Sequence, residues 1–254
     1  MKPTLRHLYE NHRDKVSDKW SIYLDEYQRL LHPLQEHELS LLEIGVQNGG
    51  SLDIWSKYFP YAKSIVGCDI DPKCATLSYP DSPIKIVVGD ICSAVTIQDV
   101  LSACNGSIDI IIDDGSHTSG DIITTFLSLF EHLNDAGTYI AEDLHCSYWP
   151  GFQGGLRHPH SSISFFKRLI DITNFEHWEE NITRCAYISE IVPIDSAYEE
   201  LLSGIHSVEF VNSLCIIKKH PYKSNTLGPR IISGLNEIVQ PVRDKAGEIS
   251  TPQK

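Results

Sequence analysis

The sequence predicts an α/β fold built on an open, doubly wound sheet that is mostly parallel. Three observations support this prediction: several short runs are apolar at every position, longer helical segments separate them, and the composition provides enough apolar material for one core. Continuous apolar runs are typical of strands that are buried on both faces of a parallel sheet. The chain has 254 residues, of which 41% are hydrophobic and 22% charged. This composition fits one domain with a modest extension.

Residues 1–38 precede the first apolar run and are expected to form an N-terminal helical cap. Their apolar side chains recur at roughly helical spacing in two groups, which are Leu5, Leu8 and Tyr9, and then Trp20, Tyr23, Leu24, Tyr27, Leu30 and Leu31. This spacing predicts two amphipathic helices.

Residues 39–220 are expected to hold the sheet. The predicted parallel strands are LSLLEIG, SIVGCDID, IKIVVGD, IDIIIDDG and GTYIAED. The segments between them are long enough for crossover helices, for instance SLDIWSKYF and DIITTFLSLFEHLND. Near the end, VEFVN and SLCIIKK meet at Asn212 and Ser213, which predicts a closing antiparallel hairpin. Residues 221–254 are polar and are expected to be a partly mobile C-terminal extension.

Charge and cysteine content exclude several classes of protein. The chain carries 21 basic and 34 acidic residues, a formal net charge of −13, which repels nucleic acid and anionic lipid. Its seven cysteines include no CxxC pair, so we expect reduced thiols and a cytoplasmic location. We find no stretch that predicts a signal peptide or a membrane span. We therefore expect no nucleic-acid or membrane partner, while a homo-oligomer stays open.

The first strand end carries a glycine turn. Ligands of open α/β sheets bind outside the carboxyl ends of the strands, and here Glu43 and Gly45 are followed by Asn-Gly-Gly at 48–50. A dinucleotide fingerprint would need glycine at Gln47, where a side chain would crowd a pyrophosphate. The acid before the turn fits a cationic ligand. S-adenosylmethionine, which has an ammonium, a sulfonium and no phosphate, matches both observations.

The second and third strand ends also carry acids. Asp69, with Asp71 two residues further on, stands where an acid meets ribose hydroxyls in nucleotide-binding α/β folds. Asp90 is suitably placed for the adenine edge. The alternative for any single acid is that it caps a helix or a turn. The ordered series favours a cofactor site.

The fourth and fifth strand ends carry Asp113-Asp114 and Glu142-Asp143. Consecutive parallel strands joined by one helix usually lie side by side, so Asp114, Glu142 and Asp143 can converge. Two like charges about 4 Å apart repel by roughly 4 kcal/mol at an effective dielectric near 20, so this cluster indicates a cation. Oxygen ligands favour Mg²⁺, with Mn²⁺ as a substitute. The alternative is that the first pair caps a helix and the second faces solvent.

At these motifs the sequence resembles a known family. LLEIGVQNGGSLDIW, IVGCDID, IIIDDGSH and IAEDLHCSYWPGF are similar to segments of the metal-dependent class I methyltransferases typified by the mycinamicin and macrocin sugar O-methyltransferases, with cephalosporin hydroxylase-like proteins as near relatives. The resemblance covers about residues 17–155 and returns at VEFVNSLCIIKK. It implies a Rossmann-like methyltransferase sheet.

The resemblance also implies roles for individual residues. The metal ligands would be Asp114, Glu142 and Asp143, and the general base would be His117. The contacts to S-adenosylmethionine would come from Glu43, Gly45, Ser51, Asp69, Asp90 and Asp113. The segment Asp18-Lys19-Trp20 resembles one that is expected to close over the cofactor, although its charges fit a solvated helix face equally well. The chain departs from the macrolide enzymes in lacking their large N-terminal domain and in having His145, which leaves the acceptor open.

These features predict a Mg²⁺-assisted, S-adenosylmethionine-dependent O-methyltransferase that acts on a hydroxyl of a sugar, glycoside or related small metabolite. A metal ion lowers the pKa of a bound hydroxyl, and His117, three residues beyond Asp114, can take its proton. The alternative is a histidine that is hydrogen-bonded near a helix start. The aromatic residues that are expected to line the acceptor pocket, or alternatively to anchor their loop, are Tyr148, Trp149 and Phe152.

Two other functions stay open from the sequence. One is a different enzyme, either hydroxylase-like or an NAD-binding Rossmann oxidoreductase, which Gln47 disfavours. The other is a non-catalytic S-adenosylmethionine-binding subunit. The intact set of candidate residues disfavours this second function.

Overall fold

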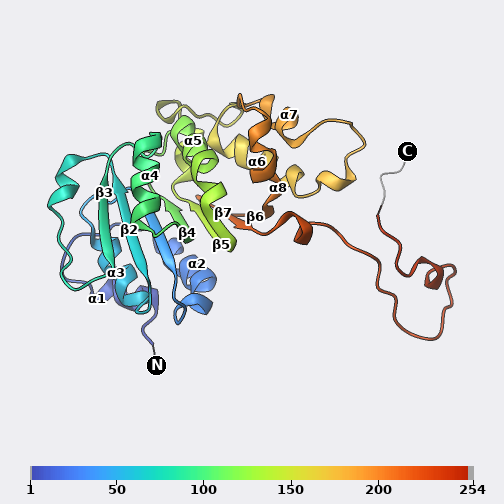
Figure 1. The fold of residues 1–254 in the computed structure, drawn as a ribbon, viewed down its shortest axis with the longest axis horizontal. Coiled ribbons are helices and arrows are strands. Elements are labelled where there is room, and N and C mark those ends of the chain that lie inside the picture. Colours follow the sequence, from blue (N-terminus) through green and yellow to red (C-terminus); the bar gives the residue numbers. More distant parts are fainter. Residues whose placement is uncertain (1, 251–254) are drawn as a thin grey trace.

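A seven-stranded sheet organises the computed structural model, which describes residues 2–250 (Figure 1). The strand order is β3-β2-β1-β4-β5-β7-β6. The first five strands are parallel, and β7 pairs antiparallel with β5 and β6. The strands are β1 (Ser40–Ile44), β2 (Ser64–Asp69), β3 (Ile84–Val88), β4 (Ile108–Asp113), β5 (Leu133–Ala141), β6 (Ile205–Val211) and β7 (Leu214–Lys219). The predicted fold class, with its closing hairpin, is confirmed.

Helices cover both faces of the sheet. They are α1 (Leu5–Asn11), α2 (Ser21–Leu31), α3 (Gly50–Tyr58), α4 (Ala94–Ala103), α5 (Ser119–Leu129), α6 (Ser162–Ile172), α7 (Arg184–Ser189) and α8 (Glu199–Ser203). In β4, Ile110 and Ile112 pack into the apolar cluster formed with α1, α2 and α3, whereas Ile111 packs into the cluster formed with α4, α5 and α6. This alternation explains why the strand is apolar at consecutive positions. The two predicted N-terminal helices are α1 and α2.

Two connections differ from the predicted pattern. A 3₁₀ turn over Pro72–Thr76 joins β2 to β3, where a crossover helix was expected. The helix expected over residues 121–135 ends at Leu129, and β5 begins at Leu133. The reason is tertiary, because Leu133 is buried in the core and Asn134 donates two side-chain hydrogen bonds of 2.7 Å to the neighbouring strand region.

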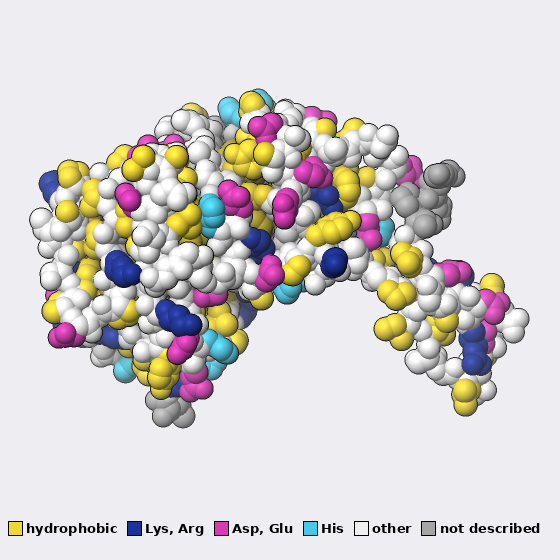
Figure 2. Space-filling model, viewed as in Figure 1, with side chains coloured by type: hydrophobic (Ala, Val, Ile, Leu, Met, Phe, Trp, Pro, Cys, Tyr) yellow, Lys and Arg dark blue, Asp and Glu magenta, His cyan; other side chains and the backbone are white. Residues whose placement is uncertain are grey.

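The C-terminal extension lies apart from the sheet (Figure 1). Residues 221–250 contain short 3₁₀ turns at Tyr222–Ser224 and Arg243–Lys245 and an isolated antiparallel bridge between Pro229 and Ile249. Figure 2 shows exposed apolar side chains along this arm. Its predicted mobility falls partly on residues 251–254, which lie outside the described residues. The division of the chain at residues 38 and 220 stays a prediction. No helix within residues 2–250 is both long and apolar enough to cross a membrane.

Candidate functional site

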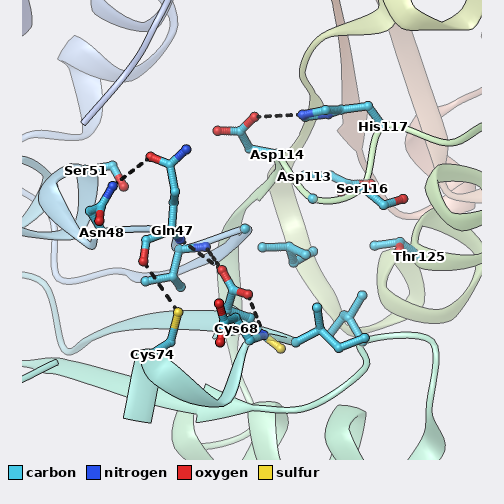
Figure 3. Close-up of a pocket in the computed structure, with 18 of the residues that line it drawn as sticks. Gln47, Asn48, Ser51, Cys68, Cys74, Asp113, Asp114, Ser116, His117 and Thr125 are labelled. Atoms are coloured by element: carbon cyan, nitrogen blue, oxygen red, sulfur yellow. Dashed lines mark hydrogen bonds and ion pairs between the residues drawn. The ribbon is translucent and has the colours of Figure 1, made fainter. Parts of the chain in front are cut away.

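A cavity of about 830 Å³ opens at the carboxyl ends of the parallel strands (Figure 3). It lies where the strand order reverses, between β1 and β4, which is the usual ligand position in such sheets. The predicted site residues that line it are Gly45, Ser51, Asp69, Asp90, Asp113, Asp114, His117 and Asp143. Two predicted residues, Glu43 and Glu142, are fully buried behind this wall and do not line it.

The glycine turn brings two loops into contact. Gly45 has φ +87°, and a Cβ atom there would lie 2.0 Å from the backbone oxygen of Asp114. The backbone N–H of Asp114 donates to the carbonyl of Ile44 at 2.9 Å. Only glycine fits this position, because the φ angle disfavours other residues and the neighbouring backbone leaves no room. The cofactor loop is therefore fixed against the loop that carries the candidate metal ligand.

The acids after β2 and β3 each hold a turn. Asp69 Oδ2 accepts the backbone N–H groups of Val46 at 2.8 Å and Gln47 at 2.9 Å, and its Oδ1 accepts that of Asp71 at 2.8 Å. Asp71 and Asp90 each accept a backbone N–H from two residues ahead, at 2.9 Å. These are the turn contacts that the sequence analysis left open as the alternative. They leave room for a ligand, because a carboxylate offers about four acceptor positions.

Asp113 is buried at the base of the cavity. The Tyr139 hydroxyl donates to its Oδ2 at 2.8 Å. Burial raises the pKa of Asp113 to about 7, and the Tyr139 hydrogen bond only partly opposes this shift. This carboxyl group therefore titrates near neutral pH.

Lys19 lies among three carboxylates. Its Nζ is 2.5 Å from Asp114 Oδ2, 2.7 Å from Glu142 Oε1 and 3.5 Å from Glu43 Oε1, and its side chain is only 2% exposed. Burial lowers the pKa of Lys19, but the three carboxylates outweigh burial and hold this pKa well above its usual value. The solvated helix face considered for this segment is therefore wrong for Lys19. The chain itself supplies part of the positive charge that the clustered acids need.

Two of these carboxylates are directed toward protein groups. Glu142 Oε1 accepts from Lys19 and from the Tyr27 hydroxyl, and burial raises the pKa of Glu142 although Lys19 opposes the shift. Glu43 Oε2 accepts from Ser51 Oγ at 2.7 Å, and burial likewise raises the pKa of Glu43. Ser51 thus lines the cavity while it orients Glu43.

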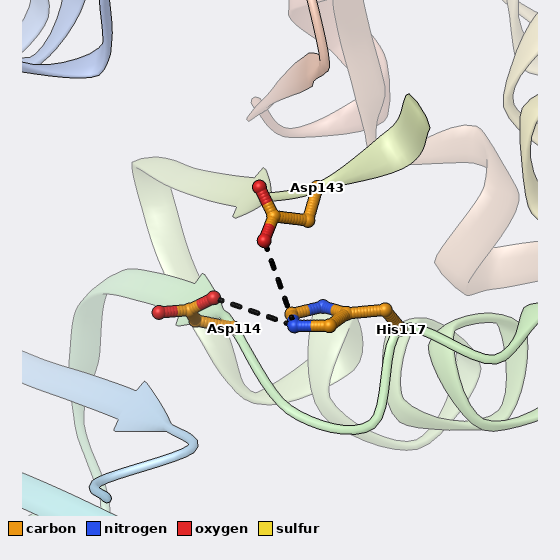
Figure 4. Close-up of side chains that lie close together, drawn as sticks. All are labelled: Asp114, His117 and Asp143. Carbon is orange, nitrogen blue, oxygen red and sulfur yellow. Dashed lines mark ion pairs between the residues drawn. The ribbon is translucent and has the colours of Figure 1, made fainter. Parts of the chain in front are cut away.

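Asp143 is held by the N-terminal segment and α2. Its Oδ1 accepts from the Tyr23 hydroxyl at 2.7 Å and from Trp20 Nε1 at 3.1 Å. The residue has φ +52°, and its backbone N–H donates to the Tyr23 hydroxyl oxygen at 3.1 Å. The other carboxylate oxygen, Oδ2, is directed toward His117 (Figure 4).

The side chains of Asp114, His117 and Asp143 point toward one another (Figure 4). His117 Nε2 is 3.6 Å from Asp143 Oδ2 and 3.9 Å from Asp114 Oδ1. One ligand atom from each residue lies within 4.8 Å of the other two, so the group could hold a metal ion. The metal ligands predicted from the sequence were Asp114, Glu142 and Asp143, whereas the group that the structure brings together contains His117 in place of Glu142. The ligand role of Glu142 stays a prediction.

Sequence reasoning missed several residues of the site. Tyr23 and Tyr27 were counted only as the apolar face of a helix, yet both hydroxyls donate to the acids of the site. The signal was present, because a buried tyrosine needs a partner for its hydroxyl group. Ser213, in the hairpin turn, hydrogen-bonds to Nδ1 of His145 at 2.6 Å. That contact gives no sequence signal.

The predicted acceptor residues lie on an open surface outside the cavity lining. The rings of Trp149 and Phe152 have centroids 6.0 Å apart, and the ring of His145 lies 5.0 Å from that of Trp149. Tyr148 and Trp149 are both exposed. They form part of an exposed surface rather than of an enclosed pocket.

Comparisons with known proteins bear on the family of this chain. No family model matches it. The 8-demethyl-8-alpha-L-rhamnosyl tetracenomycin-C 2'-O-methyltransferase of Streptomyces olivaceus is 38% identical over 165 residues, which are 61% of this chain and 42% of that protein. The demethylmacrocin O-methyltransferase of Streptomyces fradiae is 33% identical over 197 residues, which are 72% of this chain and 48% of that protein. The chain therefore spans about half the length of the curated relatives it matches.

A solved structure supports the same relationship. The MycE methyltransferase from the mycinamycin biosynthetic pathway, in complex with Mg, SAH and mycinamycin VI, superimposes with a TM-score of 0.71 at 26% sequence identity. The match covers 87% of this chain and 54% of that one. The chain is thus related to the sugar O-methyltransferases typified by the mycinamicin and macrocin enzymes, as its motifs predicted.

Proposed function

We propose that this chain is an S-adenosylmethionine-dependent, Mg²⁺-assisted O-methyltransferase that acts on a hydroxyl of a sugar-containing small molecule. The observation that carries the proposal is the group of Asp114, His117 and Asp143 on the wall of the strand-end cavity. Two further findings support it. The two relatives are named as O-methyltransferases, and the name of one includes a rhamnosyl group. The similar solved structure contains Mg and SAH.

The cavity fits a cationic cofactor better than a phosphate. More acidic than basic side chains line it; the acids are Asp18, Asp69, Asp71, Asp90, Asp113, Asp114, Asp121 and Asp143, and the bases are Lys19 and Lys73. Because Lys19 is already paired with three carboxylates, the remaining field attracts an ammonium or sulfonium and repels a pyrophosphate. The volume is also in the range of about 300–1,000 Å³ that small-molecule sites occupy.

The free carboxylate oxygens fit a divalent metal ion. Asp114 Oδ2 is occupied by Lys19, and Asp143 Oδ1 by Trp20 and Tyr23. The remaining oxygens, Asp114 Oδ1 and Asp143 Oδ2, both face the His117 side chain (Figure 4). Hard oxygen donors of this kind suit Mg²⁺ or Mn²⁺, which at such a site lowers the pKa of an acceptor hydroxyl. Glu142 stays a candidate for a further ligand.

His117 is the proposed general base. Its Nε2 lies at the cluster, where it would take the proton of the acceptor hydroxyl. The close contact between the Gly45 turn and the Asp114 loop would hold cofactor and acceptor at a defined distance, and such positioning supplies much of the rate in a bimolecular transfer.

The direct test is methyl transfer by the full chain. We would incubate it with methyl-labelled S-adenosylmethionine, Mg²⁺ and three acceptors suggested by the relatives: demethylmacrocin, mycinamicin VI and 8-demethyl-8-α-L-rhamnosyl tetracenomycin C. We expect a labelled product that is one methyl group heavier, and no product with excess chelator. Tight S-adenosylmethionine binding without transfer to any sugar would favour the non-catalytic subunit. Binding of NAD in its place would favour the oxidoreductase.

A further inference from the structure

We infer that Trp20, His145 and Trp149 form the surface on which the sugar ring of the acceptor binds; this inference rests on the proposed function. The ring centroids of Trp20 and His145 are 5.9 Å apart at an interplanar angle of 88°, and those of His145 and Trp149 are 5.0 Å apart at 75°. The three rings form a continuous row, called here the aromatic strip. It begins beside Asp143, to which Trp20 donates a hydrogen bond.

The two indole rings of the strip are largely exposed. Trp20 is 59% exposed and Trp149 is 49% exposed, whereas Trp55 in the core is fully buried. Each exposed indole leaves apolar surface in water that a bound molecule could cover. The two exposed indoles are joined through the ring of His145 into one patch beside the candidate active site, and contiguous exposed apolar patches mark binding surfaces.

The strip is held in a fixed shape. His145 is fixed through Nδ1 and its backbone N–H, which lie 2.6 and 3.2 Å from Ser213 Oγ. The loop that carries Trp149 is closed by hydrogen bonds from Gly154 and Gly155 to backbone oxygens within the loop, at 3.1 and 2.9 Å. A Cβ atom at Gly154 would lie 2.1 Å from the Ser147 oxygen. A surface that is already ordered loses little entropy when a ligand binds.

The chemistry of the strip suits a neutral pyranose. The C–H face of such a ring packs against an indole, while its hydroxyls stay free for polar groups at the edge. Here the polar group at the edge is Asp143, whose Oδ2 is left free by the hydrogen bonds of Trp20 and Tyr23 to its Oδ1.

The position of the strip also fits the proposed reaction. Trp20 contacts one oxygen of Asp143, and the other oxygen of Asp143 is 3.6 Å from the proposed base His117. A sugar ring on Trp20 would therefore place a hydroxyl at the cluster, and the rest of the acceptor could extend along Trp149 toward solvent. The sequence assigned Trp149 to the acceptor but gave no such role to Trp20 or His145.

The test is saturation-transfer NMR with neutral methyl glycosides, methyl α-L-rhamnopyranoside first, on the full chain loaded with S-adenosylhomocysteine. We expect saturation of the ring C–H protons in the wild-type chain. Trp20→Ala and Trp149→Ala should each raise the glycoside Kd by about tenfold, as expected for loss of one aromatic contact and its buried area. Trp178→Ala is the matched control, since that partly exposed indole packs on Phe175 and Tyr187 and is not part of the aromatic strip.

A conservative variant separates binding from positioning. Trp20→Phe keeps an aromatic face but removes the N–H that Asp143 accepts, so it should keep most of the glycoside affinity. If Trp20→Phe is as impaired as Trp20→Ala, Trp20 acts only by holding Asp143 and the inference is wrong. It is also wrong if no glycoside is saturated by the wild-type chain, or if both alanine variants bind glycosides normally.

Methyl transfer is measured separately, so that the two proposals can fail independently. A wild-type chain that binds glycosides through the strip but transfers no methyl group would refute the proposed function and support the strip. Transfer with an unchanged acceptor KM in Trp20→Ala and Trp149→Ala would refute the strip and support the proposed function. The Kd for S-adenosylmethionine, expected to be unchanged in every variant, confirms that each variant is folded.

Discussion

The two sides of the site hold their carboxylates in different ways. On the cofactor side, at the ends of β2 and β3, Asp69, Asp71 and Asp90 accept hydrogen bonds from backbone N–H groups. On the acid side, at the ends of β4 and β5, Glu142 and Asp143 accept from side chains more than 100 residues away in sequence.

The difference decides which residues each side depends on. A backbone N–H group is present whatever the side chain, so the cofactor side tolerates changes in the residues that donate to it. The acid side instead requires particular side chains of the N-terminal segment: Lys19, Trp20, Tyr23 and Tyr27. Residues that were expected to form only a cap therefore complete the site.

The largest effect should come from the proposed base on the acid side. His117→Ala should lower turnover by about 10² to 10⁴-fold, because a general base acts only as the transition state forms. Labelled methyl transfer measures the rate and calorimetry measures the cofactor Kd, which should not change because the cofactor side is held independently. If turnover is normal, His145 becomes the first candidate for the base. A parallel loss of Mg²⁺ affinity would make His117 a ligand.

The next effect should be on folding stability. Lys19→Met leaves buried carboxylates without their counter-ion, and breaking a buried ion pair in this way typically costs about 3–5 kcal/mol. Urea unfolding measures the loss. The matched control is Lys63→Met, since Lys63 pairs with Glu38 at 3.0 Å on the surface and exposed pairs contribute about 0–1 kcal/mol. Equal losses in the two variants would show that the acid side does not depend on Lys19.

The fold was predictable because its main signals are local. A strand that is buried on both faces must be apolar at consecutive positions, as Ile110, Ile111 and Ile112 show. The start of β5 was not predictable. It depends on Asn134, whose amide hydrogen-bonds to Ser107 and Asp109 more than twenty residues earlier.

The sequence predicted which residues belong to the site better than it predicted where their side chains point. Strand-end position alone indicated that Asp114 and Asp143 would meet, since β4 and β5 are neighbours. It did not indicate that Glu142, one residue before Asp143, would be directed toward Lys19 and Tyr27. The direction of a side chain is set by contacts with distant parts of the chain, which strand-end spacing does not contain.

A third effect concerns the pH dependence of folding stability that arises from Asp113, at the base of the cavity. The pKa of Asp113 is raised to about 7, well above the value of about 3.9 for an unfolded aspartate. Between these values the folded state binds more protons than the unfolded state, so stability should fall as pH rises from about 4 to 7. Asp113→Asn should remove this contribution, which is at most about 4 kcal/mol. The measurement is urea unfolding of the wild-type chain and of Asp113→Asn at several pH values. If the stability of the two proteins changes with pH in parallel, the raised pKa of Asp113 is wrong.

The smallest effect should come from the cofactor side. Asp69→Asn removes a charge that three backbone N–H groups share and that the proposed function assigns to the ribose hydroxyls. A hydrogen bond to a charged group is worth about 1.5–3 kcal/mol, so the Kd for S-adenosylmethionine should rise by about tenfold to a hundredfold. Calorimetry in chelator measures it. The Mg²⁺ affinity should not change, because the N-terminal side chains hold the acid side.

The control is Asp71→Asn, because the Asp71 carboxylate accepts one N–H within its own turn. This variant should raise the Kd for S-adenosylmethionine less than Asp69→Asn does. If instead Asp69→Asn lowers Mg²⁺ affinity as much as cofactor affinity, the contact between Gly45 and Asp114 couples the two sides, and they cannot be treated as independent.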